Sequence, residues 1–164
     1  MNALVVYYTQ YGNTRQVAEA IAERLQAAGT ARVISVDQLA TADLKGVDLL
    51  VMGSPTQGFG VPSQVRPILA ALPQGMLKGI PFAAFDTSLG FHRSRLMGWA
   101  TAAKRLTRAL RELGGEPLVP PETFWVAKTE GPLAEGELER AKSWAGTVLD
   151  EHKRFSERST KKGG

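Results

Sequence analysis

The chain has 164 residues, of which 43% are hydrophobic and 22% are charged, and these values exclude a disordered, collagenous or coiled-coil protein. It has no cysteine and only two histidines, which excludes disulfides, thiolate zinc sites, iron–sulfur clusters and a three-histidine metal site. No apolar run approaches the ~20 residues that span a bilayer, and no basic segment precedes the first apolar run. We therefore expect a cytoplasmic protein with no signal peptide, no membrane contact and no metal.

The formal net charge of +4 is concentrated at the C-terminal end of the sequence. Residues 1–152 hold 15 basic and 15 acidic side chains, and we expect them to form one domain. Residues 153–164 hold five basic side chains and one acidic one, which predicts a flexible basic tail. Because the domain is neutral and the tail has one aromatic residue, we expect no nucleic-acid binding. Within the domain, residues 92–111 carry six basic side chains and no acidic one.

The first half of the chain alternates strand patterns with helix patterns. Val17, Ile21 and Leu25 recur every four residues, which predicts an amphipathic helix, and Gly29 is expected to close it. Ser63 is expected to cap a second helix. Short apolar runs rich in β-branched residues predict strands buried on both faces. In this half they are residues 3–8, 31–36 and 47–53.

The second half continues the same alternation. A third helix is expected from about Trp99 to Leu113, where Gly114 stops it, and a fourth from about residue 135 to about residue 152. The strands expected here are residues 81–86 and 123–127, with 117–119 as a possible further piece of the last strand before Pro120 and Pro121. Trp144, in the pattern of the fourth helix, is expected in the core.

Strands that alternate with helices require right-handed crossovers and a parallel sheet covered on both faces. The sequence therefore predicts an α/β fold, a three-layer doubly wound five-stranded parallel sheet. Such sheets bind ligands beyond the carboxyl ends of their strands, at the point where the strand order reverses. The segments that follow the first, third and fourth strands are the places where we expect a site.

The segment after the first strand is rich in small and polar residues that form hydrogen bonds. A glycine allows successive N–H groups to converge on one point, and the start of the following helix adds its positive dipole end. This composition predicts a phosphate cradle, although it also fits an ordinary turn between a strand and a helix. A Walker loop and a dinucleotide fingerprint are both excluded, because the lysine of the first and two glycines of the second are missing. The segment is Thr9, Gln10, Tyr11, Gly12, Asn13 and Thr14.

The chain resembles the flavodoxin family through two motifs, Thr9-Gln10-Tyr11-Gly12-Asn13-Thr14 after Leu4-Val5-Val6-Tyr7-Tyr8, and Gly53-Ser54-Pro55-Thr56 after the third strand. The resemblance covers about residues 3–150, and the chain looks like a short-chain member. It implies a flavodoxin-like sheet with strand order 2-1-3-4-5 and FMN at the switch point. It also implies that the Thr9–Thr14 motif holds the FMN phosphate.

The resemblance further implies that the flavin ring lies between the segments after the third and fourth strands. One side would be Ser54, Pro55, Thr56, Gln57, Gly58 and Phe59, and the other Thr87, Ser88, Leu89, Gly90, Phe91 and His92. Phe59 or Phe91 would stack on the ring, and a peptide at Gly58 or Gly60 would reorient towards the flavin N5. No side chain is assigned as an acid, base or nucleophile, because a flavin carries its own chemistry.

The resemblance implies an FMN-binding protein that acts in electron transfer, and we favour an electron carrier over an enzyme. Flavodoxins are usually acidic around the flavin edge, whereas the segment after the fourth strand here is basic. This favours a redox partner protein with an acidic face, an anionic substrate, or no electron-transfer role of the usual kind. Asp86 is expected to accept hydrogen bonds from loop N–H groups. Two alternatives stay open: an FMN-dependent reductase or oxidase of a quinone or tetrapyrrole precursor, and a flavin-free binding protein with this fold.

Overall fold

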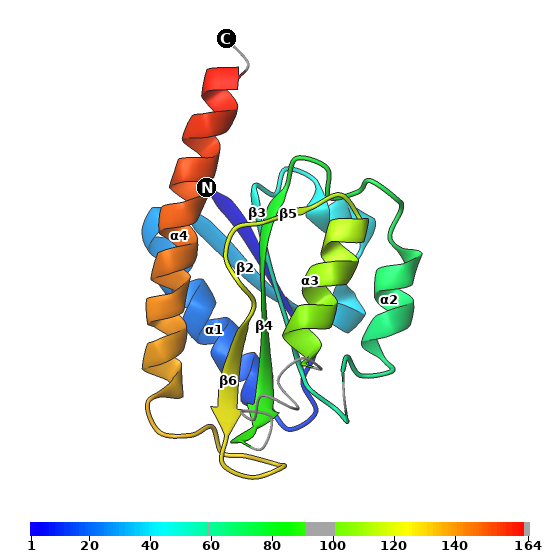
Figure 1. The fold of residues 1–164 in the computed structure, drawn as a ribbon, viewed down its shortest axis with the longest axis vertical. Helices are drawn as coiled ribbons and strands as arrows, with labels where there is room; N and C mark the ends of the chain where they lie inside the picture. The colour runs from blue at the N-terminus through cyan, green and yellow to red at the C-terminus, as the bar shows by residue number, and fades with distance from the viewer. Residues whose placement is uncertain (59, 91–100, 163–164) are drawn as a thin grey trace.

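The computed structural model describes residues 1–58, 60–90 and 101–162 (Figure 1). Its strands are β1 (Asn2–Tyr7), β2 (Thr30–Ser35), β3 (Leu49–Pro55), β4 (Pro81–Leu89), β5 (Glu116–Pro117) and β6 (Glu122–Val126). Its α-helices are α1 (Asn13–Leu25), α2 (Val65–Ala71), α3 (Ala102–Glu112) and α4 (Glu137–Lys162). Single 3-10 turns lie at Gln26–Ala28, Val36–Gln38 and Thr41–Leu44.

The strands form one parallel sheet in the order β2-β1-β3-β4-β5, and β6 also pairs with β4. The expected doubly wound sheet is thus confirmed, and its fifth position is filled by two pieces. β5 pairs with the start of β4 at Pro81 and Phe82, whereas β6 pairs with the end of β4. Pro120 and Pro121 lie between the two pieces, and proline has no N–H to donate to a ladder.

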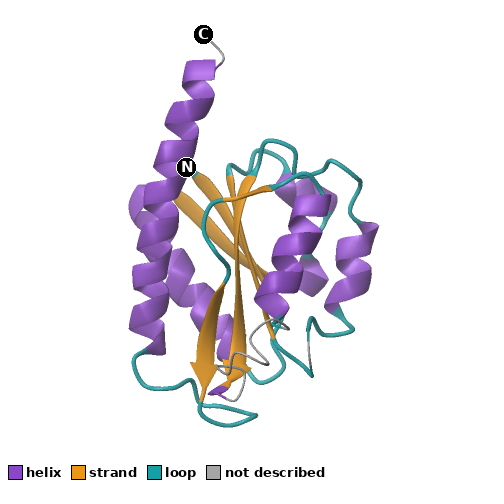
Figure 2. Ribbon diagram, in the orientation of Figure 1, coloured by secondary structure: helices purple, strands orange, loops and turns teal. Residues whose placement is uncertain are grey.

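Helices cover both faces of the sheet, α1 and α4 on one side and α2 and α3 on the other (Figure 2). A hydrophobic core lies on each face of the sheet. Because neighbouring residues of a strand point to opposite faces, β1 contributes side chains to both cores. Ala3 and Val5 are buried among α1 and α4, and Leu4 and Val6 among α2 and α3. This explains why the strand patterns are apolar throughout.

An aromatic cluster fills the core beneath α4. The rings of Phe85, Phe124 and Trp144 meet edge to face, with centroids 6.0 to 6.2 Å apart. The core position expected for Trp144 is confirmed. Gly53 of the second motif faces the same cluster, because a Cβ at this position would overlap the Phe85 ring. The glycine of that motif is therefore required by packing.

The end of β4 differs from the prediction. We expected the strand to stop at Asp86, but it continues to Leu89, so Thr87, Ser88 and Leu89 lie in a strand and not in a loop. Thr87 pairs with β3 on one side, and all three residues pair with β6 on the other. The sequence pattern missed this extension because Thr87 and Ser88 are polar, although both are buried.

The helix starts and ends show two further corrections. Ser63 does not cap α2: its hydroxyl bonds to the Gln64 side chain, and the helix begins at Val65. The fourth helix does not end at about residue 152 but continues to Lys162 (Figure 1). The expected tail is therefore helical as far as Lys162, because no glycine or proline interrupts this stretch. Among the described residues, no helix is both long and apolar enough to cross a lipid bilayer.

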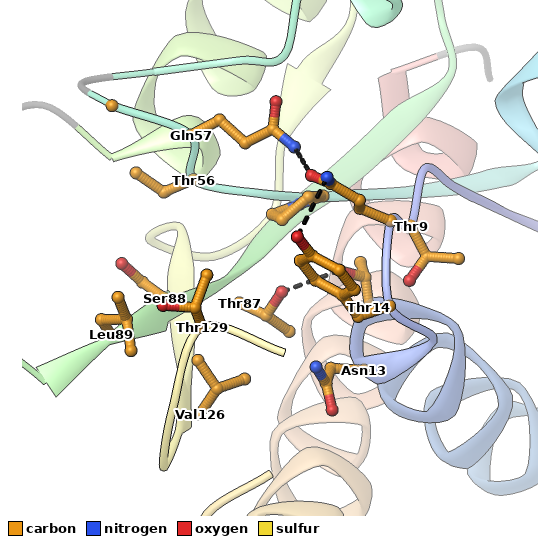
Figure 3. Close-up of a pocket in the computed structure, with 14 residues that line it drawn as sticks. Thr9, Asn13, Thr14, Thr56, Gln57, Thr87, Ser88, Leu89, Val126 and Thr129 are labelled. Atoms are coloured by element: carbon orange, nitrogen blue, oxygen red, sulfur yellow. Dashed lines mark hydrogen bonds between the residues drawn. The ribbon is translucent and has the colours of Figure 1, made fainter. Parts of the chain in front are cut away.

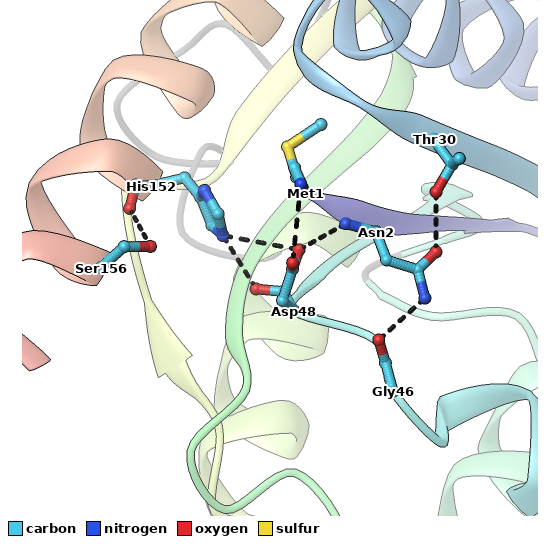
Figure 4. A network of polar contacts seen from close by, with 7 residues as sticks. All are labelled: Met1, Asn2, Thr30, Gly46, Asp48, His152 and Ser156. Carbon is cyan, nitrogen blue, oxygen red and sulfur yellow. Dashed lines mark hydrogen bonds and ion pairs between the residues drawn. The ribbon is translucent and has the colours of Figure 1, made fainter. Parts of the chain in front are cut away.

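The buried part of α4 is anchored to the amino-terminal edge of the sheet at His152 (Figure 4). This residue is buried, and its Nε2 lies 3.0 Å from the carbonyl oxygen of Asp48. The Asp48 carboxylate accepts a hydrogen bond from the backbone N–H of Asn2 at 2.8 Å. The Asn2 side chain in turn bonds to Gly46 and Thr30. The C-terminal end of α4 projects beyond the body of the protein (Figure 1), and residues 156–161 are exposed.

Candidate functional site

A pocket of about 280 Å³ lies at the carboxyl ends of β1, β3 and β4, close to the lower end of the ~300 to 1,000 Å³ range of small-molecule sites (Figure 3). It lies where the order of the strands reverses, as expected for this class of sheet. Its lining comes from the segments after β1, β3 and β6 and from β4. The lining residues are Thr9, Gln10, Tyr11, Asn13, Thr14, Pro55, Thr56, Gln57, Gly58, Thr87, Ser88, Leu89, Val126 and Thr129.

The first turn of α1 forms one end of this pocket. Gly12 is the residue that precedes the helix, and its φ of 90° is in the left-handed region that favours glycine. Having no side chain, Gly12 leaves the first N–H groups of α1 without a side-chain cap. Unsatisfied N–H groups at the positive end of a helix dipole bind anions. The cradle predicted from the sequence therefore has its backbone donors in place.

Several side chains of the predicted cradle already have protein partners. The Asn13 amide donates to the carbonyl of Glu130 at 3.1 Å, and the Thr14 and Thr87 hydroxyls bond to each other at 2.7 Å. The Thr9 hydroxyl accepts from the N–H of Gly12 at 2.9 Å, which leaves its own proton to donate. The side chains of Asn13 and Thr14 therefore hold the walls of the pocket together, and the helix N–H groups and Thr9 are the donors that fit a ligand.

Two glutamines and a tyrosine link the segments after β1 and β3 across the pocket (Figure 3). The Gln57 amide donates to the Gln10 carbonyl oxygen, and the Gln10 amide donates to the Tyr11 hydroxyl at 3.2 Å. Tyr11 is 46% exposed, although large aromatic side chains are usually covered. An exposed aromatic side chain in a pocket wall is suited to contact a flat ligand.

The segment after β3 forms a tight turn in which Gln57 and Gly60 exchange backbone hydrogen bonds of 3.1 and 3.2 Å. Gly58 has a φ of 58°, lines the pocket, and has open space where a Cβ would be. Gly60 is not among the residues that line the pocket. It faces Arg105 instead, because a Cβ there would meet Cδ of Arg105 at 2.7 Å. Of the two glycines predicted to allow a peptide to reorient, Gly58 is the one that faces the pocket.

Asp86 lies immediately below the pocket and is fully buried. Its Oδ2 accepts hydrogen bonds from the Thr56 hydroxyl at 3.0 Å and from the N–H of Ala103 at 2.9 Å. Burial raises the pKa of Asp86 above its ordinary value, and neighbouring hydrogen-bond donors offset only part of this rise. Asp86 was expected to accept hydrogen bonds from loop N–H groups, whereas the N–H that it accepts from belongs to Ala103, in the first turn of α3.

Some predicted site residues lie away from the pocket surface. Gly12 contributes backbone only, and Gly90 is exposed outside the lining. Ser54 is fully buried, and its hydroxyl donates to the carbonyl of Pro55 at 2.9 Å. The remaining predicted residues, Phe59, Phe91 and His92, lie outside the residues that the structure describes.

Val126 and Thr129 line the pocket although they were not predicted to. They belong to the end of β6 and the segment that follows it. Because β6 is parallel to β4, its carboxyl end reaches the same edge of the sheet. The predicted topology contains this signal, since the fifth strand of such a sheet also ends at the ligand-binding edge.

The described lining contains no charged side chain. It combines neutral N–H and O–H donors near α1 with apolar groups from Pro55, Leu89 and Val126 further along. This arrangement fits a ligand with a phosphate at one end and a flat, partly apolar body. Among the described residues, no three His, Cys, Asp or Glu side chains gather in a way that would hold a metal ion.

Comparisons with known proteins agree with this geometry. A family model described as Flavodoxin matches residues 5–144. Oxidised Flavodoxin 2 from Bacillus cereus is similar with a TM-score of 0.75 at 19% identity, covering 92% of this chain and 99% of that chain. A flavodoxin, WrbA-like protein from Agrobacterium tumefaciens has a TM-score of 0.72 at 24% identity, and the match covers 94% of this chain and 98% of that chain. A short-chain flavodoxin associated with a non-canonical PDU bacterial microcompartment has a TM-score of 0.74 at 18% identity, and the match covers 93% of this chain and 99% of that chain. No curated protein sequence matches the chain.

Proposed function

The chain belongs to the flavodoxin family, and from that premise we propose that it binds one FMN noncovalently in the pocket of Figure 3 and acts as an electron carrier. The observation that carries this proposal is the uncharged pocket against the uncapped first turn of α1. Bound FMN supplies one- and two-electron transfer, and the protein binds it, orients it and excludes water.

The phosphate group would bind at the start of α1. Its donors would be the first N–H groups of the helix and the Thr9 hydroxyl, while Asn13 and Thr14 hold the surrounding walls. The described lining carries no charged side chain, and such neutral donors are suited to retain a phosphate monoester. The ring would lie further along, against Tyr11, Gly58 and Leu89. The predicted contacts from Phe59, Phe91 and His92 belong to this proposal as well.

Titration with FMN and with riboflavin, which lacks the phosphate, tests this assignment. We expect riboflavin to bind at least about tenfold more weakly, because it forfeits the hydrogen bonds to the helix N–H groups. Replacement of Thr9 by Val should weaken FMN binding and leave riboflavin binding unchanged. Equal affinity of the unaltered protein for both ligands would place the phosphate away from α1.

The carrier role, as opposed to a reductase, is tested by turnover. The sequence contains no dinucleotide fingerprint, which favours a carrier that receives electrons from another protein. The FMN-loaded protein should therefore consume reduced nicotinamide nucleotide very slowly when a quinone is present. Rapid turnover would instead support the alternative of an FMN-dependent reductase.

We propose a redox partner with an acidic face. Exposed basic side chains line the outer surface of α3, namely Lys104, Arg105, Arg108 and Arg111. Electron transfer from the reduced protein to an acidic iron–sulfur protein should slow as salt is added, because opposite charges that steer association are screened. Transfer to basic cytochrome c should not slow. The reverse pattern would contradict an acidic partner.

A further inference from the structure

The first turn of α3 is held in an unusual way. Thr101 precedes this 11-residue helix, but its side chain makes no capping hydrogen bond. Instead, the N–H of Ala102 donates to the Thr56 hydroxyl at 2.8 Å, and the N–H of Ala103 donates to Asp86 Oδ2 at 2.9 Å. Thr56, which directly follows β3, and Asp86 of β4 therefore supply the acceptors that a helix normally takes from its own N-cap residue.

Thr56 is at the centre of this network. Its hydroxyl donates to Asp86 and accepts from Ala102, so both the proton and a lone pair of the oxygen are used. Its backbone N–H donates to the carbonyl of Thr87 at 2.9 Å. Thr56 and Thr87 both line the pocket (Figure 3), whereas Asp86 and Ala102 do not. One side chain thus connects the pocket wall to the buried carboxyl group and to α3.

The fold by itself does not require a buried carboxyl group at position 86. A carboxylate in the protein interior is costly unless hydrogen bonds and nearby positive charge compensate for its lost hydration. At Asp86 the compensation comes from the N–H of Ala103, from the hydroxyls of Thr56, Thr123 and Thr101, and from the positive end of the α3 dipole. No described residue donates to Oδ1. A serine or aspartate at position 101 would cap α3 without any such cost, but would leave the helix unconnected to the pocket.

We propose that Asp86 and Thr56 are positioning residues that hold the β3 and β4 walls of the pocket and the start of α3 at one buried point. The proposal rests on the proposed function, because its purpose is to fix the walls against which FMN would lie. Thr56 belongs to the predicted wall Ser54–Phe59, and Asp86 directly precedes Thr87, where the other predicted wall begins. Loss of the network should therefore change ligand binding as well as stability.

Thr56→Val removes the hydroxyl at nearly constant shape, and Thr56→Ser keeps it. Asp86→Ala and Asp86→Asn form a second pair, since asparagine retains an acceptor oxygen. Thr107→Val is the matched control: its hydroxyl donates to the carbonyl of Ala103 at 2.8 Å on the same helix, and it does not line the pocket. FMN affinity, the midpoint potentials of bound FMN and thermal unfolding are measured for all five variants.

We expect Thr56→Val to weaken FMN binding about tenfold and to shift the midpoint potentials, since both hydrogen bonds of the hydroxyl, to Asp86 and from Ala102, are lost. Thr56→Ser and Thr107→Val should stay within about twofold of the unaltered protein, and Asp86→Asn should be milder than Asp86→Ala. Unchanged affinity and potentials in Thr56→Val would overturn the proposal even if that variant unfolds at lower temperature. Thr56→Ser behaving like Thr56→Val would also overturn it.

Amide hydrogen exchange separates this proposal from the proposed function. If the unaltered protein binds no FMN, the proposed function fails. Amide hydrogen exchange alone then tests whether Thr56 and Asp86 position the pocket walls. Faster exchange in Thr56→Val at Ala102 and also at Gln57, in the pocket wall, would support the role. Unchanged exchange at Gln57 would overturn it.

Discussion

Buried polar side chains around the pocket bond mainly to one another. Thr14 and Thr87 share a hydrogen bond, Asn13 bonds to the backbone after β6, and Asp86 bonds to Thr56. The sequence predicts that Asn13 and Thr14 contact a ligand because they lie in the glycine-containing polar segment before the first helix, and the flavodoxin resemblance implies the same of Thr87. Sequence patterns give the position of a side chain along the chain but not its partner, so the division between ligand donors and wall contacts needed the structure.

The raised pKa of Asp86 predicts a specific dependence of stability on pH. A group whose pKa is higher in the folded state binds its proton more tightly there than in the unfolded chain. Its contribution to stability is therefore fully present below the unfolded pKa of about 3.9 and declines as pH rises towards the folded value. Asp86→Asn lacks this titration.

Urea unfolding of both proteins between about pH 3.5 and 7.5 measures this effect. The unfolding free energy of the unaltered protein, relative to Asp86→Asn, should fall with rising pH from about pH 3.9 and then level off. A relative stability that rises with pH would show that the folded protein lowers the pKa of Asp86, contrary to the effect of its burial.

Gly53 gives a second prediction at the scale of a single residue. A Cβ at this position would overlap the Phe85 ring, so Gly53→Ala should lower the unfolding free energy by about 1 to 3 kcal/mol or more. Gly146 in α4 is the matched control, because a Cβ there makes only ordinary contacts with Arg24, the nearest at 3.7 Å. Gly146→Ala should raise stability by about 0.5 to 1 kcal/mol through helix propensity. Equal effects of the two substitutions on urea unfolding would contradict the packing role of Gly53.

At the scale of elements, the sequence predicted the strands and helices well and their ends less well. Continuous apolar runs located β1, β3 and the start of β4, because a parallel strand is buried on both faces. The end of β4 was missed because burial of Thr87 and Ser88 depends on pairing with β3 and β6, which a local pattern does not contain. The end of α4 was missed because an exposed helical stretch has no apolar stripe to mark it.

The projecting part of α4 should contribute little to stability. Residues 157–161 are exposed, whereas His152 is buried and bonds to the carbonyl of Asp48. Deletion of residues 157–164 should change the unfolding free energy by less than about 0.5 kcal/mol. His152→Ala should lower it by about 1 kcal/mol, the net value of one hydrogen bond. Urea unfolding that shows the deletion to be the more damaging change would contradict this arrangement.

At the scale of the whole molecule, the alternation of strands and helices was sufficient to predict the sheet and the edge at which the pocket lies. Basic side chains cluster in two places, the projecting end of α4 and the segment that includes α3. The proposal of an acidic partner rests on the second cluster. The contribution of β6 to the pocket follows from the topology, although Val126 and Thr129 themselves carry no recognisable motif.

Titration of the purified protein with FMN, followed by flavin fluorescence and visible absorbance, tests the central claim most directly. The account predicts saturation at one FMN per chain, quenching of flavin fluorescence and a shifted absorbance spectrum as the ring leaves water. It also predicts that excess riboflavin displaces FMN poorly. Failure of FMN to bind, or binding that riboflavin reverses as readily as FMN itself, would contradict it.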